Sequence, residues 1–180
     1  MNHELLQQLA QQLLSGELDS AQFLHALQAA QSDPTMEAVV DLDRARRCGF
    51  PEVVYAPGKS PSAIIAICQK LQSAGQAILV TRLDWEQGSA LSEAFPSGIW
   101  QQRARTFRSH PDGQTDSSTA TGFVPVVSAG TSDLPVAEEA IETLQWMGIR
   151  TALFPDLGVA GPQRLQQRLP ELSTADAIVV

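Results

Sequence analysis

The sequence predicts an α/β protein in which a helical hairpin precedes a small α/β domain and the first part of a parallel-sheet domain. From about residue 39, apolar runs of strand length alternate with amphipathic helical patterns. The last sixty residues follow the order β-α-β-α-β, whose right-handed crossovers would make the sheet parallel. The expected divisions are a helical hairpin (1–33), an N-terminal α/β domain (34–109), a linker (110–122) and the parallel-sheet domain (123–180).

Composition argues against several classes of protein. Twenty acidic residues against 12 basic ones give a net charge of −8, which argues against nonspecific binding of nucleic acid. No apolar stretch approaches the roughly 20 residues of a membrane span, and the amino terminus lacks the features of a signal peptide. Cys48 and Cys68 are too few for a disulfide framework. We therefore expect a cytoplasmic protein with neither nucleic acid nor membrane as a partner.

The first segment has the pattern of two short helices. Gly16 interrupts the first apolar stripe, and Asp19 can cap a second helix. A small hairpin that docks on the rest or on another subunit explains this pattern, and a dedicated partner-binding module is the alternative. The first stripe consists of Leu5, Leu6, Leu9 and Leu13.

The next segment alternates between strand and helix patterns. Residues 77–80 form a continuous apolar run, which is typical of a buried parallel strand. Cys68 lies on the apolar stripe of a helix, so we expect it in the core. The elements expected in order are a helical turn (39–47), a strand (53–55), a helix (61–74), a strand (77–83), a helix (86–95) and an outer strand (100–108).

The last segment follows a run of turn-forming residues at 110–122. Gly148 is placed to end the first helix of this segment in a left-handed conformation. The chain stops on an apolar strand, from which we expect it to be a truncated piece. The expected elements are strands at 123–127, 150–154 and 176–180 and helices at 134–147 and 161–169.

The turn at residues 128–133 is the strongest candidate site. Gly130 permits a tight turn, Thr131 and Ser132 offer hydroxyl groups, and the first amides of the following helix would point outward. A phosphate or carboxylate suits such a helix start. Asp133 could contact a ligand, but Ser132 or Asp133 could equally be a simple N-cap.

A second turn, at residues 155–161, would neighbour the first in a parallel sheet. Asp156 would face the same crevice, and Gly158 and Gly161 allow close approach of a ligand. Arg164 could pair with an anion, although an arginine at this place is more commonly a solvated helix residue.

A third candidate lies in the N-terminal α/β domain. Asp41, Arg44 and Arg47 recur every three residues and so share a broad helix face, and Lys59 follows the strand at 53–55. Three cations in an acidic chain suit an anion site. The alternative is a surface pair of Asp41 and Arg44.

Other motifs are missing from the sequence. Its three histidines lack metal-ligand spacing, its three tryptophans form no series for stacking bases, and neither a Walker nor a Gly-x-Gly-x-x-Gly pattern occurs. The residues themselves therefore predict no metal site.

Three stretches carry a family resemblance. They are Asp41-x-x-Arg44-x-x-Arg47-x-Gly49-Phe50-Pro51-Glu52-Val53 followed by Gly58-Lys59, then residues 128–140 (SAGTSDLPVAEEA), then residues 156–161 (DLGVAG). Over residues 39–180 the chain resembles the LarB family, which includes the cyanobacterial circadian phase modifier. The resemblance implies that residues 123–180 begin a PurE-like (AIR carboxylase-like) three-layer sandwich of the flavodoxin or Rossmann type.

The resemblance also implies an activity. LarB-like enzymes add carbon dioxide to the pyridinium ring of nicotinic acid adenine dinucleotide and hydrolyse its phosphoanhydride to AMP, in the synthesis of the nickel-pincer nucleotide. Mg²⁺ is the only cofactor candidate, no organic cofactor is implied, and a homo-oligomer is expected, with octamers in the PurE group. The implied catalytic residues are Asp133 and Asp156, and the implied substrate-binding residues are Gly130, Thr131, Ser132, Gly158, Gly161, Arg44, Arg47 and Lys59.

Two departures and two alternatives accompany this interpretation. Gln163 stands where the family usually has histidine, and the family's cysteine nucleophile would lie beyond Val180, since neither Cys48 nor Cys68 matches its context. A truncated chain of this kind would be inactive by itself. The alternatives are a non-catalytic circadian regulator and a purine-biosynthesis carboxylase, and the long region before residue 109 argues against the latter.

Overall fold

The computed structural model describes residues 3–24, 40–111 and 122–180. The chain divides into two compact units, residues 1–40 and residues 41–180.

The first unit has the two predicted helical segments. Helix α1 (His3–Ser15) ends at Gly16, whose φ of 78° places it in the left-handed region. The second helix begins after Asp19, whose Oδ1 accepts the Gln22 N–H at 2.7 Å, while Gln22 Oε1 accepts the Asp19 N–H at 3.0 Å. This reciprocal capping box fixes the start of the helix, of which the described part ends at Leu24.

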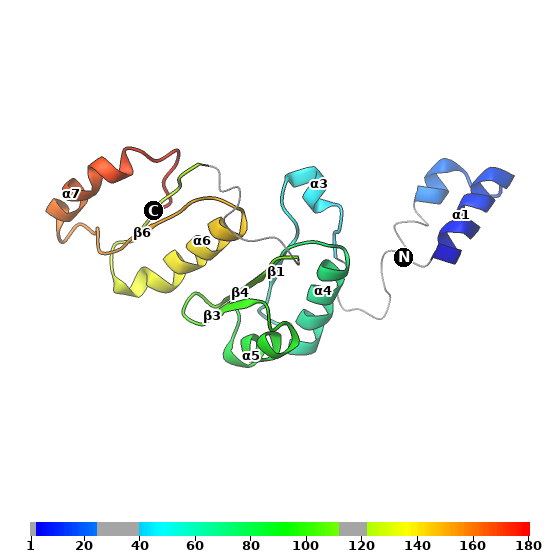
Figure 1. Ribbon diagram of the computed structural model, residues 1–180, viewed down its shortest axis with the longest axis horizontal. Coiled ribbons are helices and arrows are strands. Elements are labelled where there is room, and N and C mark those ends of the chain that lie inside the picture. Colours follow the sequence, from blue (N-terminus) through cyan, green and yellow to red (C-terminus); the bar gives the residue numbers. More distant parts are fainter. Residues whose placement is uncertain (1–2, 25–39, 112–121) are drawn as a thin grey trace. The chain divides into compact units, whose positions relative to one another are not determined.

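The second unit opens with a mixed four-stranded sheet (Figure 1). Its strand order is β1-β2-β4-β3, with β1 and β2 parallel and the other pairs antiparallel. The predicted helices and the first two strands are confirmed. The elements are α3 (Arg44–Cys48), β1 (Val53–Tyr55), α4 (Pro61–Ser73), β2 (Ile78–Thr81), α5 (Trp85–Ala94), β3 (Ile99–Gln101) and β4 (Thr106–Ser109).

The prediction of a single outer strand over residues 100–108 is wrong. A turn separates β3 from β4, with the Arg105 N–H donating to Gln102 O at 3.2 Å and Arg105 at a φ of 56°. Strand β4 is central, between β2 and β3, and all four of its residues are buried. The loose alternation in the sequence came from two short strands joined by a tight turn.

Helices α4 and α5 cover one face of this sheet. Ser60 caps α4 by accepting the Ala63 N–H, and Asp84 forms a capping box with Gln87 at the start of α5. Phe107 of β4 is fully buried on this face, against Phe95. The buried residues of α4 are Ile64, Ile67, Cys68 and Leu71, which confirms Cys68 as a core residue.

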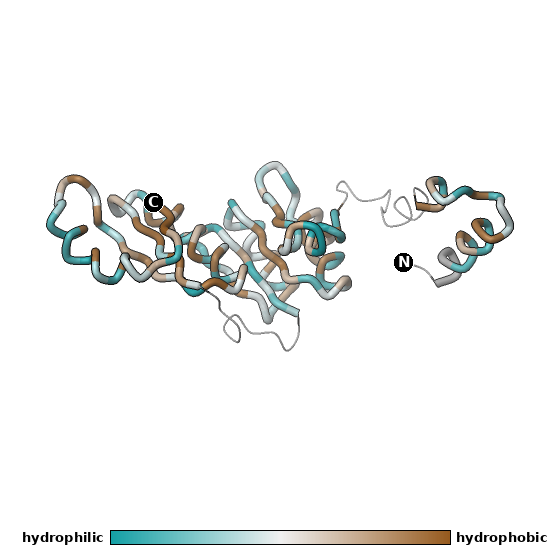
Figure 2. The backbone as a smooth tube through the Cα atoms, turned by 90° about the horizontal axis from the view of Figure 1, so that it is seen from above, coloured by the Kyte–Doolittle hydropathy of each residue, from teal (hydrophilic) through white to brown (hydrophobic). Residues whose placement is uncertain are grey.

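The second sheet is parallel, as predicted. Strands β5 (Val126–Val127) and β6 (Leu153–Phe154) pair directly, and a further parallel bridge joins Phe123 to Arg150. The third predicted strand is reduced to one bridge, in which the Val127 N–H donates to Val179 O at 2.8 Å. Figure 2 shows the residues near the C-terminus as an apolar stretch. Helix α6 (Leu134–Trp146) follows β5, and α7 (Pro162–Leu172) follows β6.

Helix α6 packs against both sheets, touching β2 and β4 on one side and β5 and β6 on the other. The sequence predicts one apolar face for this helix, formed by Ala137, Ala140, Ile141, Leu144 and Met147, whereas the structure covers it on both sides. Since both sides are covered, its most buried residues include Glu142 as well as Ala137 and Trp146. Glu142 is compensated by Arg108, which lies on the opposite face of β4 from Phe107 because successive strand residues alternate.

Candidate functional site

Two loops meet at the carboxyl ends of β5 and β6. The Leu157 N–H donates to Ser128 O at 3.0 Å, and the Ser128 N–H donates to Phe154 O at 3.1 Å. A Cβ on Gly158 would lie only 2.8 Å from Ala129 O, so the second loop passes directly over the first. The two turns identified in the sequence, residues 128–133 and 155–161, therefore lie against each other at the edge where open α/β sheets bind ligands in a crevice.

The first loop forms a 3₁₀ turn (η1, Thr131–Asp133) that leads into α6. Asp133 Oδ2 accepts the Gly130 N–H at 2.9 Å, so this carboxylate caps the turn. The side chains of Thr131, Ser132 and Asp133 are exposed, and the first amides of a helical turn have no intrahelical partner. As the N-cap residue of α6, Asp133 makes no side-chain hydrogen bond to that helix, because its carboxylate accepts the preceding Gly130 N–H instead. The exposed carboxylate is still accessible to a ligand.

Gly130 does not need the conformational freedom that the sequence suggested. Its φ of −151° is extended backbone that any residue adopts, and an added Cβ would have only Asp133 Oδ2 nearby, at 3.9 Å. The turn is tight because of the Asp133 cap. A methyl group at this position would project into the open crevice.

The second loop carries a pair of opposite charges. Arg164 donates from Nη1 to Asp156 Oδ2, and both side chains are substantially exposed. Asp156 has a φ of 62°, and the Arg164 guanidinium lies over Gly161. The arginine considered for anion binding is thus present at the crevice, paired with the aspartate considered for catalysis.

Ser128 lies at the junction of the two loops and was treated in the sequence only as part of a turn. Its side chain is 6% exposed, and its Oγ has no hydrogen-bond partner among the residues that the structure describes. Its position at the end of a buried strand, immediately before the turn, was the available signal. A buried hydroxyl without a partner is uncommon and calls for an explanation.

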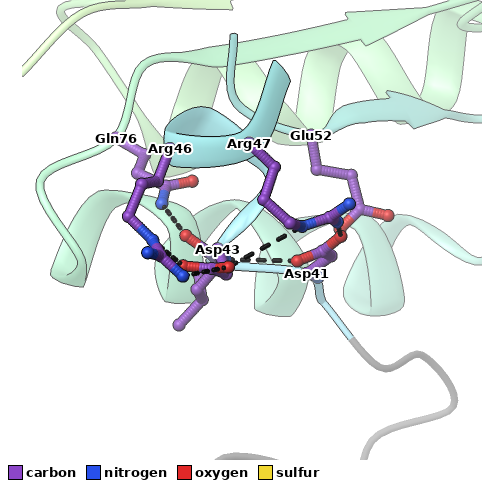
Figure 3. A network of polar contacts seen from close by, with 7 residues as sticks. Asp41, Asp43, Arg46, Arg47, Glu52 and Gln76 are labelled. Carbon is purple, nitrogen blue, oxygen red and sulfur yellow. Dashed lines mark hydrogen bonds and ion pairs between the residues drawn. The ribbon is translucent and has the colours of Figure 1, made fainter. Parts of the chain in front are cut away.

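The cations of the N-terminal α/β domain are largely engaged within their own segment (Figure 3). Arg47 pairs with Asp41 and Arg46 pairs with Asp43, whereas the pair considered from the sequence was Asp41 with Arg44. The hydrogen bond from Arg46 lowers the pKa of Asp43 and raises that of Arg46. Arg44 is exposed, and the described residues offer its side chain no hydrogen bond or ion pair.

Lys59 lies after β1, where its Nζ donates to Tyr55 O at 2.7 Å. It belongs to the carboxyl edge of the parallel pair β1–β2. The buried Gln87 side chain fills that edge, donating to Lys59 O at 2.8 Å and to Ala56 O at 3.3 Å. This edge therefore has its own internal hydrogen-bonding group.

The structure does not bring these cations to the crevice of the second sheet. Phe50, which follows α3, lies against Trp146 at the carboxyl end of α6, with ring centroids 6.3 Å apart. The crevice lies at the amino end of α6, and a helix of 13 residues is about 20 Å long. Arg44 and Arg47 therefore accompany the far end of this helix.

A groove of about 730 Å³ lies between the β3–β4 turn and α6 with β6, and the sequence did not predict it. Arg103 and Glu138 form an ion pair in its wall, and their hydrogen bond raises the pKa of Arg103. Trp100 lines the groove and contacts Trp85, with ring centroids 5.0 Å apart and the rings tilted by 58°.

Residues 3–24, 40–111 and 122–180 offer neither a candidate metal cluster nor a candidate membrane span. In these ranges, no three histidine, cysteine, aspartate or glutamate side chains gather as they would around a metal ion. None of the helices described there has the length and apolar character needed to cross a bilayer. Both cysteines are free thiols, Cys48 exposed and Cys68 buried.

Comparison with known proteins adds two similarities. Residues 33–111 match the family described as the LarB/PurE-like N-terminal domain. Over 148 residues the chain is 32% identical to an uncharacterised protein of Methanocaldococcus jannaschii, in a match that covers 78% of this chain and 56% of the relative. The chain thus matches just over half the length of that relative.

Proposed function

We propose, from the match of residues 33–111 to the LarB/PurE-like N-terminal domain, that this chain forms the nucleotide-binding part of a LarB-like enzyme. The substrate would be nicotinic acid adenine dinucleotide. Carboxylation replaces a ring hydrogen by a carboxylate from carbon dioxide and releases a proton. Hydrolysis adds water across the phosphoanhydride and releases AMP, which leaves pyridinium-3,5-biscarboxylic acid mononucleotide.

The observation that supports this proposal most is the packing of the two loops against each other at the carboxyl ends of β5 and β6. Leu157 and Gly158 pack against Ser128 and Ala129, so a ligand held by one loop also meets the other. Such a crevice, beyond the carboxyl ends of two parallel strands and at a helix start, suits a mononucleotide phosphate.

We assign the mononucleotide phosphate to the exposed turn at Thr131 and Ser132, next to Gly130. Asp133 would keep its bond to the Gly130 N–H and present its second oxygen to the ribose. The opposite loop, with Asp156, Gly158 and Gly161, would lie beside the pyridinium ring. On binding, the substrate's carboxylate would compete with Asp156 for the Arg164 guanidinium, because their exposed pair is weak.

Mg²⁺ would be held chiefly by the substrate's pyrophosphate, as this ion commonly is. Arg44 and Arg47 accompany the far end of α6, so a role for them in substrate binding would require a second copy, and Lys59 would act with them. This part of the proposal therefore goes together with the expected homo-oligomer.

Incubation of the full-length protein with nicotinic acid adenine dinucleotide, bicarbonate and Mg²⁺ tests the proposed reaction. Mass spectrometry should detect AMP and a mononucleotide heavier by one carboxyl group. Calorimetric titration with nicotinic acid mononucleotide tests binding separately from turnover. The absence of both product and binding would contradict the proposal. Binding without product would restrict the proposal to the nucleotide site.

A further inference from the structure

The two parallel strand pairs of residues 41–180 end in different ways. At the carboxyl edge of β1–β2, the Gln87 amide occupies the space between the loops. It donates to Ala56 O and Lys59 O, and its Oε1 accepts the Asp84 N–H at 3.0 Å. That edge is closed by a side chain of the protein itself, with its polar groups satisfied.

At the carboxyl edge of β5–β6, no described side chain joins the two loops by hydrogen bonds as Gln87 does at the other edge. The peptide of Ser128 is fully used, since its N–H donates to Phe154 O and its carbonyl accepts the Leu157 N–H. Its hydroxyl is nine-tenths buried and has no partner among the described residues. A polar group in this state is destabilising unless something outside the protein's own groups completes it.

We propose that the Ser128 hydroxyl is a binding group for the phosphate of the nucleotide in this crevice, an inference that rests on the proposed function. Ser128 directly precedes the turn that carries the exposed Thr131 and Ser132, while Gly158 lies close over Ala129. A hydroxyl donating to a phosphate oxygen forms a charge-assisted bond, which is stronger than a bond between neutral groups. Ser128 would thus hold the innermost phosphate oxygen, beneath the exposed Thr131 and Ser132.

The chain offers a matched control for this idea. Thr106 Oγ1 is likewise buried and without a partner among the described residues, but it lies in the centre of the first sheet, in β4. Thr106→Val removes that hydroxyl at nearly constant volume. Any effect common to the loss of a buried hydroxyl should appear in this variant too.

The test compares the wild-type chain with Ser128→Ala and Thr106→Val by calorimetric titration. Nicotinic acid mononucleotide carries the phosphate, and nicotinic acid riboside lacks it. We expect Ser128→Ala to weaken mononucleotide binding about tenfold or more and to leave riboside binding unchanged. Its melting temperature should be unchanged or higher, because the protein alone loses no hydrogen bond. Thr106→Val should bind both ligands as the wild type does.

The outcomes separate the two proposals. Wild-type binding that Ser128→Ala leaves intact would overturn the role of Ser128 and leave the nucleotide site standing. A wild-type chain that binds no mononucleotide would overturn the proposed function and this inference together. If Ser128→Ala fails to fold, Ser128→Cys replaces it, since a thiol has a similar size but is a weak hydrogen-bond donor. Equal losses for both ligands would also contradict a contact with phosphate.

Discussion

Arg108 of β4 donates from Nε to Glu142 Oε2 of α6 at 2.6 Å, and more than nine-tenths of each side chain is buried. Gln145, one turn further along α6, accepts a second bond from the same guanidinium at 3.2 Å. This contact joins the first sheet to the helix that begins at the crevice. It is flanked by two ion pairs that are more exposed than the Arg108 pair, namely Arg82 with Glu139 and Arg103 with Glu138.

Replacing Glu142 by Ala should lower the free energy of unfolding by about 3–5 kcal/mol, because the buried guanidinium would lose its carboxylate. Urea unfolding followed by circular dichroism measures this change. Glu139→Ala is the control on the same helix, and its more exposed pair with Arg82 should contribute only about 0–1 kcal/mol. Equal losses in the two variants would show that burial does not make the Arg108–Glu142 pair more stabilising than the exposed pair.

Gly158→Ala should displace the second loop, since the new Cβ would meet the rigid Ala129 carbonyl at 2.8 Å. We expect a loss of about 1–3 kcal/mol in stability and a clear loss of nucleotide affinity. Gly161→Ala is the matched variant. There the new methyl meets only the flexible end of Arg164, which can move away, so stability should change little. Thermal unfolding measures the stability of both variants. Equal losses of stability in the two would contradict this account of the loops.

Gly130→Ala should fold normally, within about 0.5 kcal/mol of the wild type, because its backbone is extended and the added methyl has room. The same methyl would project into the crevice, so nucleotide binding should weaken. Thermal unfolding and calorimetric titration measure the two effects. A strongly destabilised Gly130→Ala variant would show that the turn requires glycine after all.

Asp133→Ala removes the acceptor of the Gly130 N–H and should cost about 1 kcal/mol, as the loss of a helix cap commonly does. Asp133→Asn keeps an acceptor oxygen and should retain most of this stability. In an active enzyme, both variants should abolish turnover if the carboxylate charge serves the reaction. Full activity in Asp133→Asn would reduce Asp133 to a cap.

The two thiols should differ sharply in reactivity. Burial raises the pKa of Cys68 to about 12, so near pH 8 almost no thiolate forms there, whereas Cys48 is exposed. Iodoacetamide should modify one cysteine in the native chain and two after denaturation. In Cys48→Ser, the native chain should take up no label. Rapid native labelling of Cys48→Ser would contradict the packing of α4.

Most helices and strands could be predicted from spacing, because capping residues and glycines mark their ends. Asp19, Ser60 and Asp84 cap helices as such residues do, and Gly148 has the left-handed φ of 74° expected after α6. The β3–β4 turn was missed because a left-handed Arg105 gives no such signal. The central place of β4 depends on its pairing with β2, which is distant in sequence.

The candidate site was predicted in part. The sequence identified both loops of the crevice, since strand ends and turn residues are local features. It did not reveal that Gly130 is extended or that Arg164 pairs with Asp156, because these depend on side-chain placement. Nor could it show that Ser128 lacks a partner, which only the surrounding atoms decide. The burial of Glu142 was unpredictable for the same reason, since a glutamate on a helix is ordinarily solvated.

Because α6 packs against β2 and β4 as well as against β5 and β6, we expect residues 33–111 not to fold stably by themselves, although they match a family domain by sequence. In that fragment expressed alone, the face of β2 and β4 that α6 covers would be exposed to water. Arg108 would also lose its partner Glu142. Such a fragment should be poorly soluble, and adding back residues 122–180 in trans should rescue it. Helix α6 thus also covers the sheet of β1, β2, β4 and β3. Residues 41–111 and 122–180 should therefore unfold in one thermal transition.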